Sequence, residues 1–140
     1  MLSKKNRYAF HALEYLALKQ GTGPVLIEEI AREKQIPKKF LESILLELKK
    51  AGFLSSKMGK GGGYYLLKSP DEIRFAHIIR LIDGPIALLP CVSLNYHEKC
   101  NECVHSEDNC PLRAVMIEVR DESLKVLENK TLADIISGRN

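Results

Sequence analysis

The sequence predicts a mainly α-helical fold with one short β-hairpin and a long helix near the carboxyl end. Three observations lead to this class. Apolar residues recur with helical spacing up to residue 51, the spacing then changes to two short extended runs around a glycine-rich segment, and helical spacing returns after residue 111. At 140 residues the chain has room for one domain with a core and an appended oligomerisation element.

Three helices are expected before the extended runs. The first spans Lys4 to Gln20 and carries a core-facing stripe at helical spacing, made of Ala9, Ala12, Leu13, Leu16 and Ala17. The second spans Ile27 to Lys34. The third spans Pro37 to Ala51, because the fixed φ of proline suits a first helical turn. Gly52 follows where a left-handed cap is wanted.

The extended runs predict a hairpin with a glycine-rich connection. Its strands are expected over Phe53–Lys57 and Tyr64–Leu67, with the segment Met58–Gly63 between them. Three helices followed by such a hairpin describe a winged helix-turn-helix. We therefore predict a DNA-binding domain over residues 1–70, with the hairpin as its wing.

Residues 71–140 are predicted to form a second part, with a metal- or cluster-binding loop and dimerisation helices. A short apolar helix is expected from Phe75 to Asp83, and a cysteine-bearing loop from Leu88 to Pro111. A long helix is expected from Leu112 to Leu127. It has one apolar stripe and further apolar residues at Ile117 and Leu124, which predicts burial against a second copy of the chain.

The charge is distributed unevenly between these two parts. Residues 1–70 carry 13 Lys and Arg against 6 Asp and Glu, whereas residues 71–140 carry 8 against 12. A basic amino-terminal half suits a polyanion such as DNA, since it attracts phosphates over a long range. A solvated surface with uneven charge is the alternative.

The predicted DNA contacts come from the third helix and the wing. A helix fits the major groove, and residues of its first turns reach base edges; here these are Lys38, Lys39, Glu42 and Ser43. In the wing, glycines allow a close backbone approach to phosphate beside two lysines; these residues are Lys57, Lys60, Gly61 and Gly62. The glycine run does not match a P-loop, so nucleotide binding is disfavoured. The alternative for the helix residues is a solvent-exposed face without contacts.

Four cysteines fall within 20 residues, as Cys91, Cys100, Cys103 and Cys110, with the spacing C-x8-C-x2-C-x6-C. In an intracellular chain such clustering indicates thiolate ligation of a soft metal or cluster. Structural zinc usually takes two close pairs, and only one is present, whereas iron–sulfur clusters accept unequal spacings. An iron–sulfur cluster, 2Fe–2S or 4Fe–4S, is therefore favoured. Zinc, a Cys100–Cys103 redox dithiol and unligated thiols remain alternatives.

Several short motifs, in order along the chain, resemble the IscR/NsrR-type family of winged-helix transcription regulators. They are Arg7-Tyr8-Ala9, Phe40-Leu41-Glu42, Gly59-Lys60-Gly61-Gly62-Gly63-Tyr64 and Thr131-Leu132-Ala133-Asp134. The resemblance implies a homodimer that binds inverted-repeat operators in double-stranded DNA, and that senses iron, iron–sulfur status, nitric oxide or redox state. It also implies that the outer cluster ligands are Cys91 and Cys110.

The same resemblance leaves two ligand positions open and reveals one departure. The middle cysteine ligand corresponds to either Cys100 or Cys103, and the extra thiol completes a four-thiolate set. His11 stands at a first-helix position that some relatives use as a ligand; as an alternative it is an ordinary surface histidine. Met58 occupies the wing position where some relatives place an arginine in the minor groove, so that role passes to Lys57 or Lys60.

Other function classes are disfavoured by the sequence. No apolar run approaches the roughly 20 residues of a membrane span, and Met1–Lys5 does not begin a signal peptide. We therefore expect a cytoplasmic protein without membrane contact. No serine, histidine and carboxylate pattern indicates nucleophilic catalysis, so an enzyme is not expected. His77, within the apolar fourth helix, is expected to be a core histidine.

Overall fold

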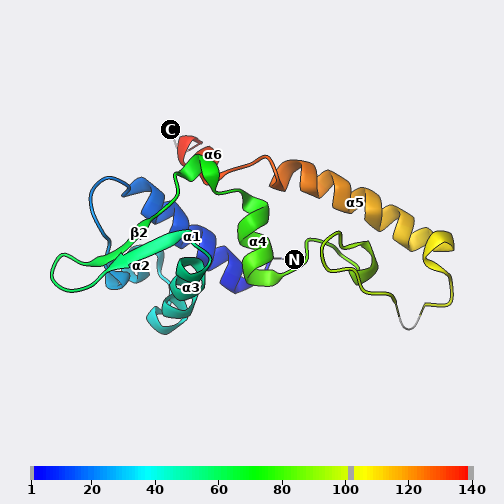
Figure 1. Ribbon diagram of the computed structural model, residues 1–140, viewed down its shortest axis with the longest axis horizontal. Coiled ribbons are helices and arrows are strands. Elements are labelled where there is room, and N and C mark those ends of the chain that lie inside the picture. Colours follow the sequence, from blue (N-terminus) through cyan, green and yellow to red (C-terminus); the bar gives the residue numbers. More distant parts are fainter. Residues whose placement is uncertain (1, 101–102, 139–140) are drawn as a thin grey trace.

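The computed structural model describes residues 2–100 and 103–138. Its helices are α1 (Lys4–Leu18), α2 (Ile27–Lys34), α3 (Lys38–Lys50), α4 (Phe75–Asp83), α5 (Pro111–Leu127) and α6 (Leu132–Ser137), and its strands are β1 (Leu54–Lys57) and β2 (Gly63–Leu66). Figure 1 shows a body made of α1 to α4, the hairpin and α6, from which α5 and the cysteine loop extend as an arm. The predicted mainly α-helical fold with one hairpin is confirmed.

The core forms where α1 packs on α3. The predicted stripe of α1 is buried, and it meets an apolar face of α3 composed of Leu41, Ile44, Leu45 and Leu48, none of them accessible to solvent. Two details differ from prediction. Pro37 caps α3 with extended backbone instead of occupying its first turn. Phe40 is half-buried instead of fully buried, and its ring packs edge-on against Tyr8 with 5.5 Å between the ring centroids.

The turn between α2 and α3 sets the direction of the third helix. Gln35 adopts a left-handed conformation with φ 53°, which few residues other than glycine accept. The next residue, Ile36, is 3% exposed, and its N–H donates to the carbonyl of Ala31 at 3.0 Å. The buried Ile36 therefore anchors a tight turn that projects the first turn of α3 out of the body.

The wing is joined to the body by an isolated β-bridge. β1 and β2 are antiparallel, with Leu54 opposite Leu66 and Lys57 opposite Gly63. Val25 pairs with Tyr64 through two backbone hydrogen bonds of 2.8 Å. This bridge holds the two-stranded hairpin against the body, and Leu54 and Leu66 of the hairpin enter the core.

The chain returns to the body after the arm through α6, which the sequence analysis did not predict. Thr131 and Asp134 form a capping box at its start, with the Thr131 N–H donating to the Asp134 carboxylate at 2.8 Å. Leu132 is 1% exposed in the core, and its N–H donates to the carbonyl of Ile73. Arg80 of α4 also pairs with Glu128 at 2.8 Å, which fixes the base of the arm.

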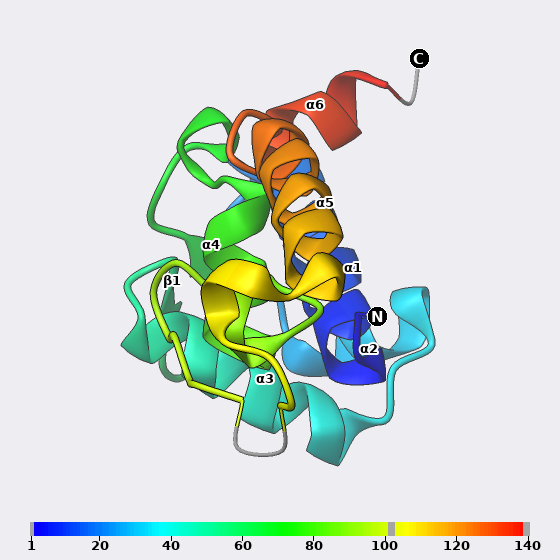
Figure 2. The ribbon, with the colours of Figure 1, turned by 90° about the vertical axis from the view of Figure 1, so that its right-hand side faces the viewer.

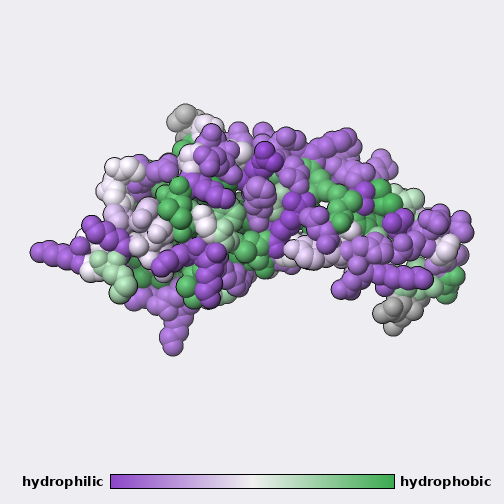
Figure 3. All heavy atoms as spheres, viewed as in Figure 1, coloured by the Kyte–Doolittle hydropathy of each residue, from purple (hydrophilic) through white to green (hydrophobic). Residues whose placement is uncertain are grey.

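Helix α5 lies mostly outside the core. None of its residues is buried, although it is 17 residues long. Its large exposed apolar side chains are Leu112, Val115, Val119 and Val126. Figure 3 shows apolar side chains gathered over this helix on the arm. Within the described residues, no helix is both long and apolar enough to cross a membrane.

One carboxylate ties the end of α4 to the start of α1. Asp83 accepts hydrogen bonds from the Ser3 N–H and the Asn6 side-chain amide, each at 3.0 Å, and from the Ser3 hydroxyl. Burial by itself raises the pKa of Asp83, but the hydrogen bonds from Ser3 and Asn6 outweigh it and lower the pKa below its ordinary value.

We expect Asp83→Asn to destabilise the protein at neutral pH and to matter less in acid. A carboxyl whose pKa is lower in the folded state stabilises above its unfolded pKa of about 3.9, and this stabilisation is lost as pH falls through the folded pKa. Because Asp83 is exposed, the effect at neutral pH is below about 1 kcal/mol. Urea unfolding of the wild-type protein and Asp83→Asn at pH 7 and pH 3 measures the difference in their free energies of unfolding. The same difference at both pH values would contradict this role of Asp83.

Candidate DNA-binding surface and cysteine site

The first turns of α3 present the predicted base-reading residues to solvent. Lys38, Lys39, Glu42 and Ser43 are all exposed. The Lys38 ammonium pairs with Glu28 of α2 at 2.8 Å, and Ser43 donates to the carbonyl of Phe40 at 2.9 Å. The ion pair raises the pKa of Lys38 and lowers that of Glu28, mainly through the hydrogen bond between them. Such an exposed pair is weak, so phosphate can displace Glu28.

The wing brings its lysines to the same side as α3 through a direct contact. Lys49 of α3 donates to the Ser56 hydroxyl of β1 at 2.7 Å, which fixes the hairpin relative to the helix. Lys57 and Lys60 are exposed, and Met58 at the turn is 91% exposed. The structure therefore presents two exposed basic segments, one helical and one looped, connected through the last turn of α3.

The wing glycines have different structural roles. Gly61 is exposed, with φ +75° and open space where a Cβ would lie. Gly62 is buried instead, and a Cβ there would lie 2.2 Å from the carbonyl oxygen of Lys57. Of the two, only Gly61 is exposed where a phosphate can approach; Gly62 is needed to close the turn. The DNA contacts of both remain predictions.

All four cysteines line one cavity of about 420 Å³ between the loop and the start of α5. Cys91 lies in a short 3₁₀ turn, η2 (Pro90–Val92), and is 7% exposed. Cys110 is half-buried and is the residue that caps α5. Cys100 and Cys103 are exposed, on either side of residues 101–102, which lie outside the described part of the loop. The fold thus brings together thiols that are spread over a window of 20 residues in the sequence.

The thiols are near one another without being assembled as a closed ligand set. A hydrogen bond with the Cys100 thiol raises the pKa of Cys103, and negative charge on Cys100 and Cys110 acts in the same direction. Among residues 2–100 and 103–138, however, no group of three His, Cys, Asp or Glu side chains has the spacing of a metal site.

Two arginines of α5, neither of them predicted as a site residue from the sequence, hold the Cys91 turn. Arg113 donates to the carbonyl of Cys91 at 3.4 Å, and Arg120 to the carbonyl of Val92 at 2.8 Å. They are seven residues apart, which places them on one face of the helix. Figures 1 and 2 show the loop folded back beside the first part of α5. The heptad spacing was the available signal, but nothing in the sequence identified the acceptor.

The histidines contribute little to this site. His11 is exposed on α1 and does not line the cysteine cavity. His97 pairs with Glu107 at 3.0 Å, which connects two parts of the loop. The expectation that His77 is a core histidine is wrong: it is exposed, because α4 buries the side that carries Ala76 and Ile79.

The comparisons with known proteins agree along almost the whole chain. Residues 2–138 match the model of the Rrf2 family, described as iron-dependent transcriptional regulators. An Rrf2-like regulator of Rhodobacter capsulatus is 41% identical, covering 100% of this chain and 95% of its own length.

Solved structures are also similar to this chain. CymR, the global cysteine regulator of B. subtilis, superposes with a TM-score of 0.82 at 31% identity, covering 100% of this chain and 98% of its own. IscR of T. potens superposes with a TM-score of 0.78 at 28% identity, covering 100% and 88%. These matches confirm the resemblance and the winged-helix fold: the chain belongs to the Rrf2 family and is a DNA-binding transcription regulator.

Proposed function

We propose that this regulator acts as a homodimer whose DNA affinity is set by an iron–sulfur cluster held by Cys91, Cys100, Cys103 and Cys110. The observation that carries the proposal is the convergence of all four thiols on one cavity beside α5. The family description as iron-dependent regulators supports it. The signal would be iron, redox state or nitric oxide.

The donor set fits a cluster better than a single ion. Thiolates are the ligands that iron–sulfur clusters take from proteins, and four are available here. Structural zinc sites usually take two close cysteine pairs, whereas only one such pair, Cys100 and Cys103, is present here. When bound, the cluster would supply reversible one-electron chemistry and sensitivity to oxidants.

The exposed side of α5 supports the dimer. Val115 and Val119 are 53% and 38% exposed on a helix that buries none of its residues in its own chain. A second copy of α5 would remove this apolar surface from water, and two-fold pairing of identical surfaces is the commonest form of homodimer. Two recognition helices related in this way read an inverted-repeat operator in double-stranded DNA.

Arg113 and Arg120 supply a physical connection from the thiols to that helix. Their hydrogen bonds join the turn that contains Cys91 to α5, so a displacement of the turn is transmitted to the helix. If α5 forms the dimer contact, its position sets the separation of the two α3 helices. Occupancy of the cysteine site then changes DNA affinity because it favours one separation over another.

DNA binding of this kind is expected to weaken steeply with salt. Operator fragments selected from genomic DNA, titrated by fluorescence anisotropy between 50 and 300 mM KCl, should give a linear fall of log affinity with log salt. Lys39→Gln, which removes one cation from each recognition helix, should reduce the slope by about two for a dimer. Lys130→Gln serves as the charge-matched control: Lys130 is exposed at the base of the arm, where its carbonyl accepts from the Phe75 N–H at the start of α4. A flat salt dependence, or equal effects of both variants, contradicts the proposal.

A further inference from the structure

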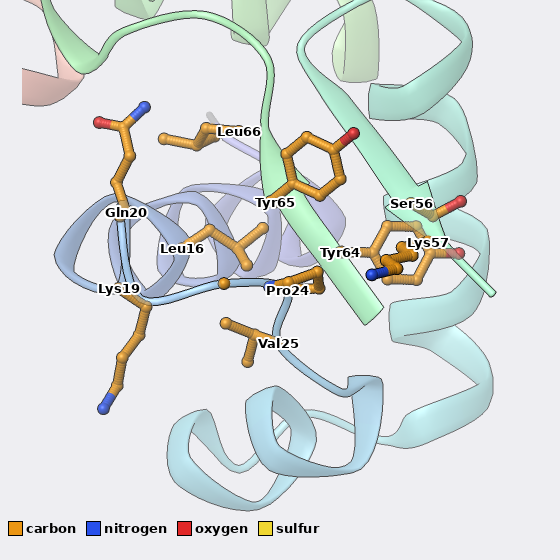
Figure 4. Close-up of a pocket in the computed structure, with 12 residues that line it drawn as sticks. Leu16, Lys19, Gln20, Pro24, Val25, Ser56, Lys57, Tyr64, Tyr65 and Leu66 are labelled. Atoms are coloured by element: carbon orange, nitrogen blue, oxygen red, sulfur yellow. The ribbon is translucent and has the colours of Figure 1, made fainter. Parts of the chain in front are cut away.

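A second cavity lies at the base of the wing, away from the cysteines. It is open to solvent, has a volume of about 500 Å³ and is lined by the end of α1, the segment between α1 and α2, and both wing strands (Figure 4). Pockets for small organic ligands have volumes of roughly 300 to 1,000 Å³. The cavity therefore has the size of a ligand site, and the proposed function does not use it.

Its floor is apolar and its two walls are connected. In Figure 4, Leu16 extends from α1 toward β2, and Leu66 extends from β2 back toward α1. Leu16, Val25 and Leu66 are 2%, 5% and 6% exposed. The paired backbone hydrogen bonds between Val25 and Tyr64, each 2.8 Å, hold one wall to the other.

The rim of the cavity is positively charged. Lys19 and Lys57 line it together with hydroxyl and amide groups, and none of the described lining residues is Asp or Glu. Within the described chain, neither lysine is a member of an ion pair. The Lys19 ammonium lies 5.7 Å from the Tyr15 ring, a contact that leaves its charge unneutralised. An apolar floor below a cationic rim is complementary to an amphipathic anion.

We propose that this cavity binds a small carboxylate with an apolar body. The apolar part would displace water from Pro24 and the ring of Tyr65, beside the buried Leu16, Val25 and Leu66. The carboxylate would accept charge-assisted hydrogen bonds from Lys57 or Lys19. When Lys57 binds the carboxylate, it is not available to a DNA phosphate. The ligand also contacts the wing strands directly. By linkage, the carboxylate and the operator weaken each other's binding by the same factor.

The test uses the full-length, metal-free protein without DNA, so that it does not depend on the cysteine site. Methyl resonances of Leu16, Val25 and Leu66 are followed by NMR while hexanoate, phenylacetate or 4-phenylbutyrate is added. At least one acid should shift all three resonances. The alcohol and the amine with the same apolar body, and inorganic phosphate, should each bind at least about tenfold more weakly than that acid, because each lacks either the negative charge or the apolar body.

Matched variants locate the charge that binds. The double variant Lys57→Gln and Lys19→Gln should bind the acid about tenfold more weakly than the wild-type protein. The double variant Lys50→Gln and Lys130→Gln, which loses the same charge outside the cavity, should bind it as tightly as the wild type. Saturating acid should also reduce the operator affinity of the wild-type protein about threefold or more. The proposal is overturned if alcohols bind as tightly as acids, if no acid shifts these methyls, or if the two double variants behave alike. An unchanged operator affinity overturns the coupling to DNA.

Discussion

Cys91→Ser is expected to abolish cluster binding while leaving the fold intact. Cys91 is the most buried of the four thiols, and the arginines of α5 fix the turn that contains it, so no other side chain can take its place. Iron and acid-labile sulfide in the anaerobically reconstituted protein should fall to background. The metal-free variant should unfold in urea within about 1 kcal/mol of the metal-free wild type, since serine is close in shape and Cys91 lies outside the core cluster.

Ser106→Ala, in the same loop, is the control for this variant and should retain the full iron content. Cys100→Ser and Cys103→Ser should each lose the cluster if all four thiolates are ligands, and one of them should keep it if only three are. Retention of iron and sulfide by Cys91→Ser contradicts the ligand assignment.

Gly63→Ala is expected to detach the wing from the body. A Cβ at Gly63 would lie 2.3 Å from the carbonyl oxygen of Val25, and the backbone has φ +140°. Both features disfavour any side chain at position 63. The clash can be relieved only if the bridge between Val25 and Tyr64 opens. The free energy of unfolding should fall by about 2 kcal/mol or more. Operator affinity should also fall, because Lys57 and Lys60 lose their fixed position relative to α3.

Gly61→Ala provides the matched comparison. Gly61 also has positive φ, but nothing lies within 4 Å of its missing Cβ, so only the conformational cost of about 1 kcal/mol applies. Urea unfolding and operator titration of both variants measure the difference. Equal losses at the two positions would mean that the contact with Val25 does not hold the wing.

The elements of the body were predictable because their patterns are local. Helical periodicity gave α2 and α4 with their observed limits, and the switch to extended runs at Phe53 located the hairpin within a residue. Gly52 takes the expected left-handed conformation, with φ +87°. The clustering of the four cysteines in sequence was likewise a local signal, and it led to the cavity that they line.

The parts that were missed depend on contacts between distant residues. Leu132 of the short α6 enters a core built mostly from residues 9–66. Asp83 gains its partners only when α4 meets Ser3, and Arg113 and Arg120 gain theirs when the loop folds back on α5. The need for glycine at position 63 arises from Val25, a residue 38 positions earlier. No spacing rule encodes such pairings.

The most direct test of a cluster-controlled regulator is the iron, zinc and acid-labile sulfide content of the protein purified anaerobically, measured together with operator affinity before and after exposure to air or nitric oxide. The account predicts iron and sulfide in equal amounts, at least two of each per protomer, little zinc, and an operator affinity that changes when the cluster is lost. Stoichiometric zinc without sulfide, with the same operator affinity in air and without it, would contradict the account.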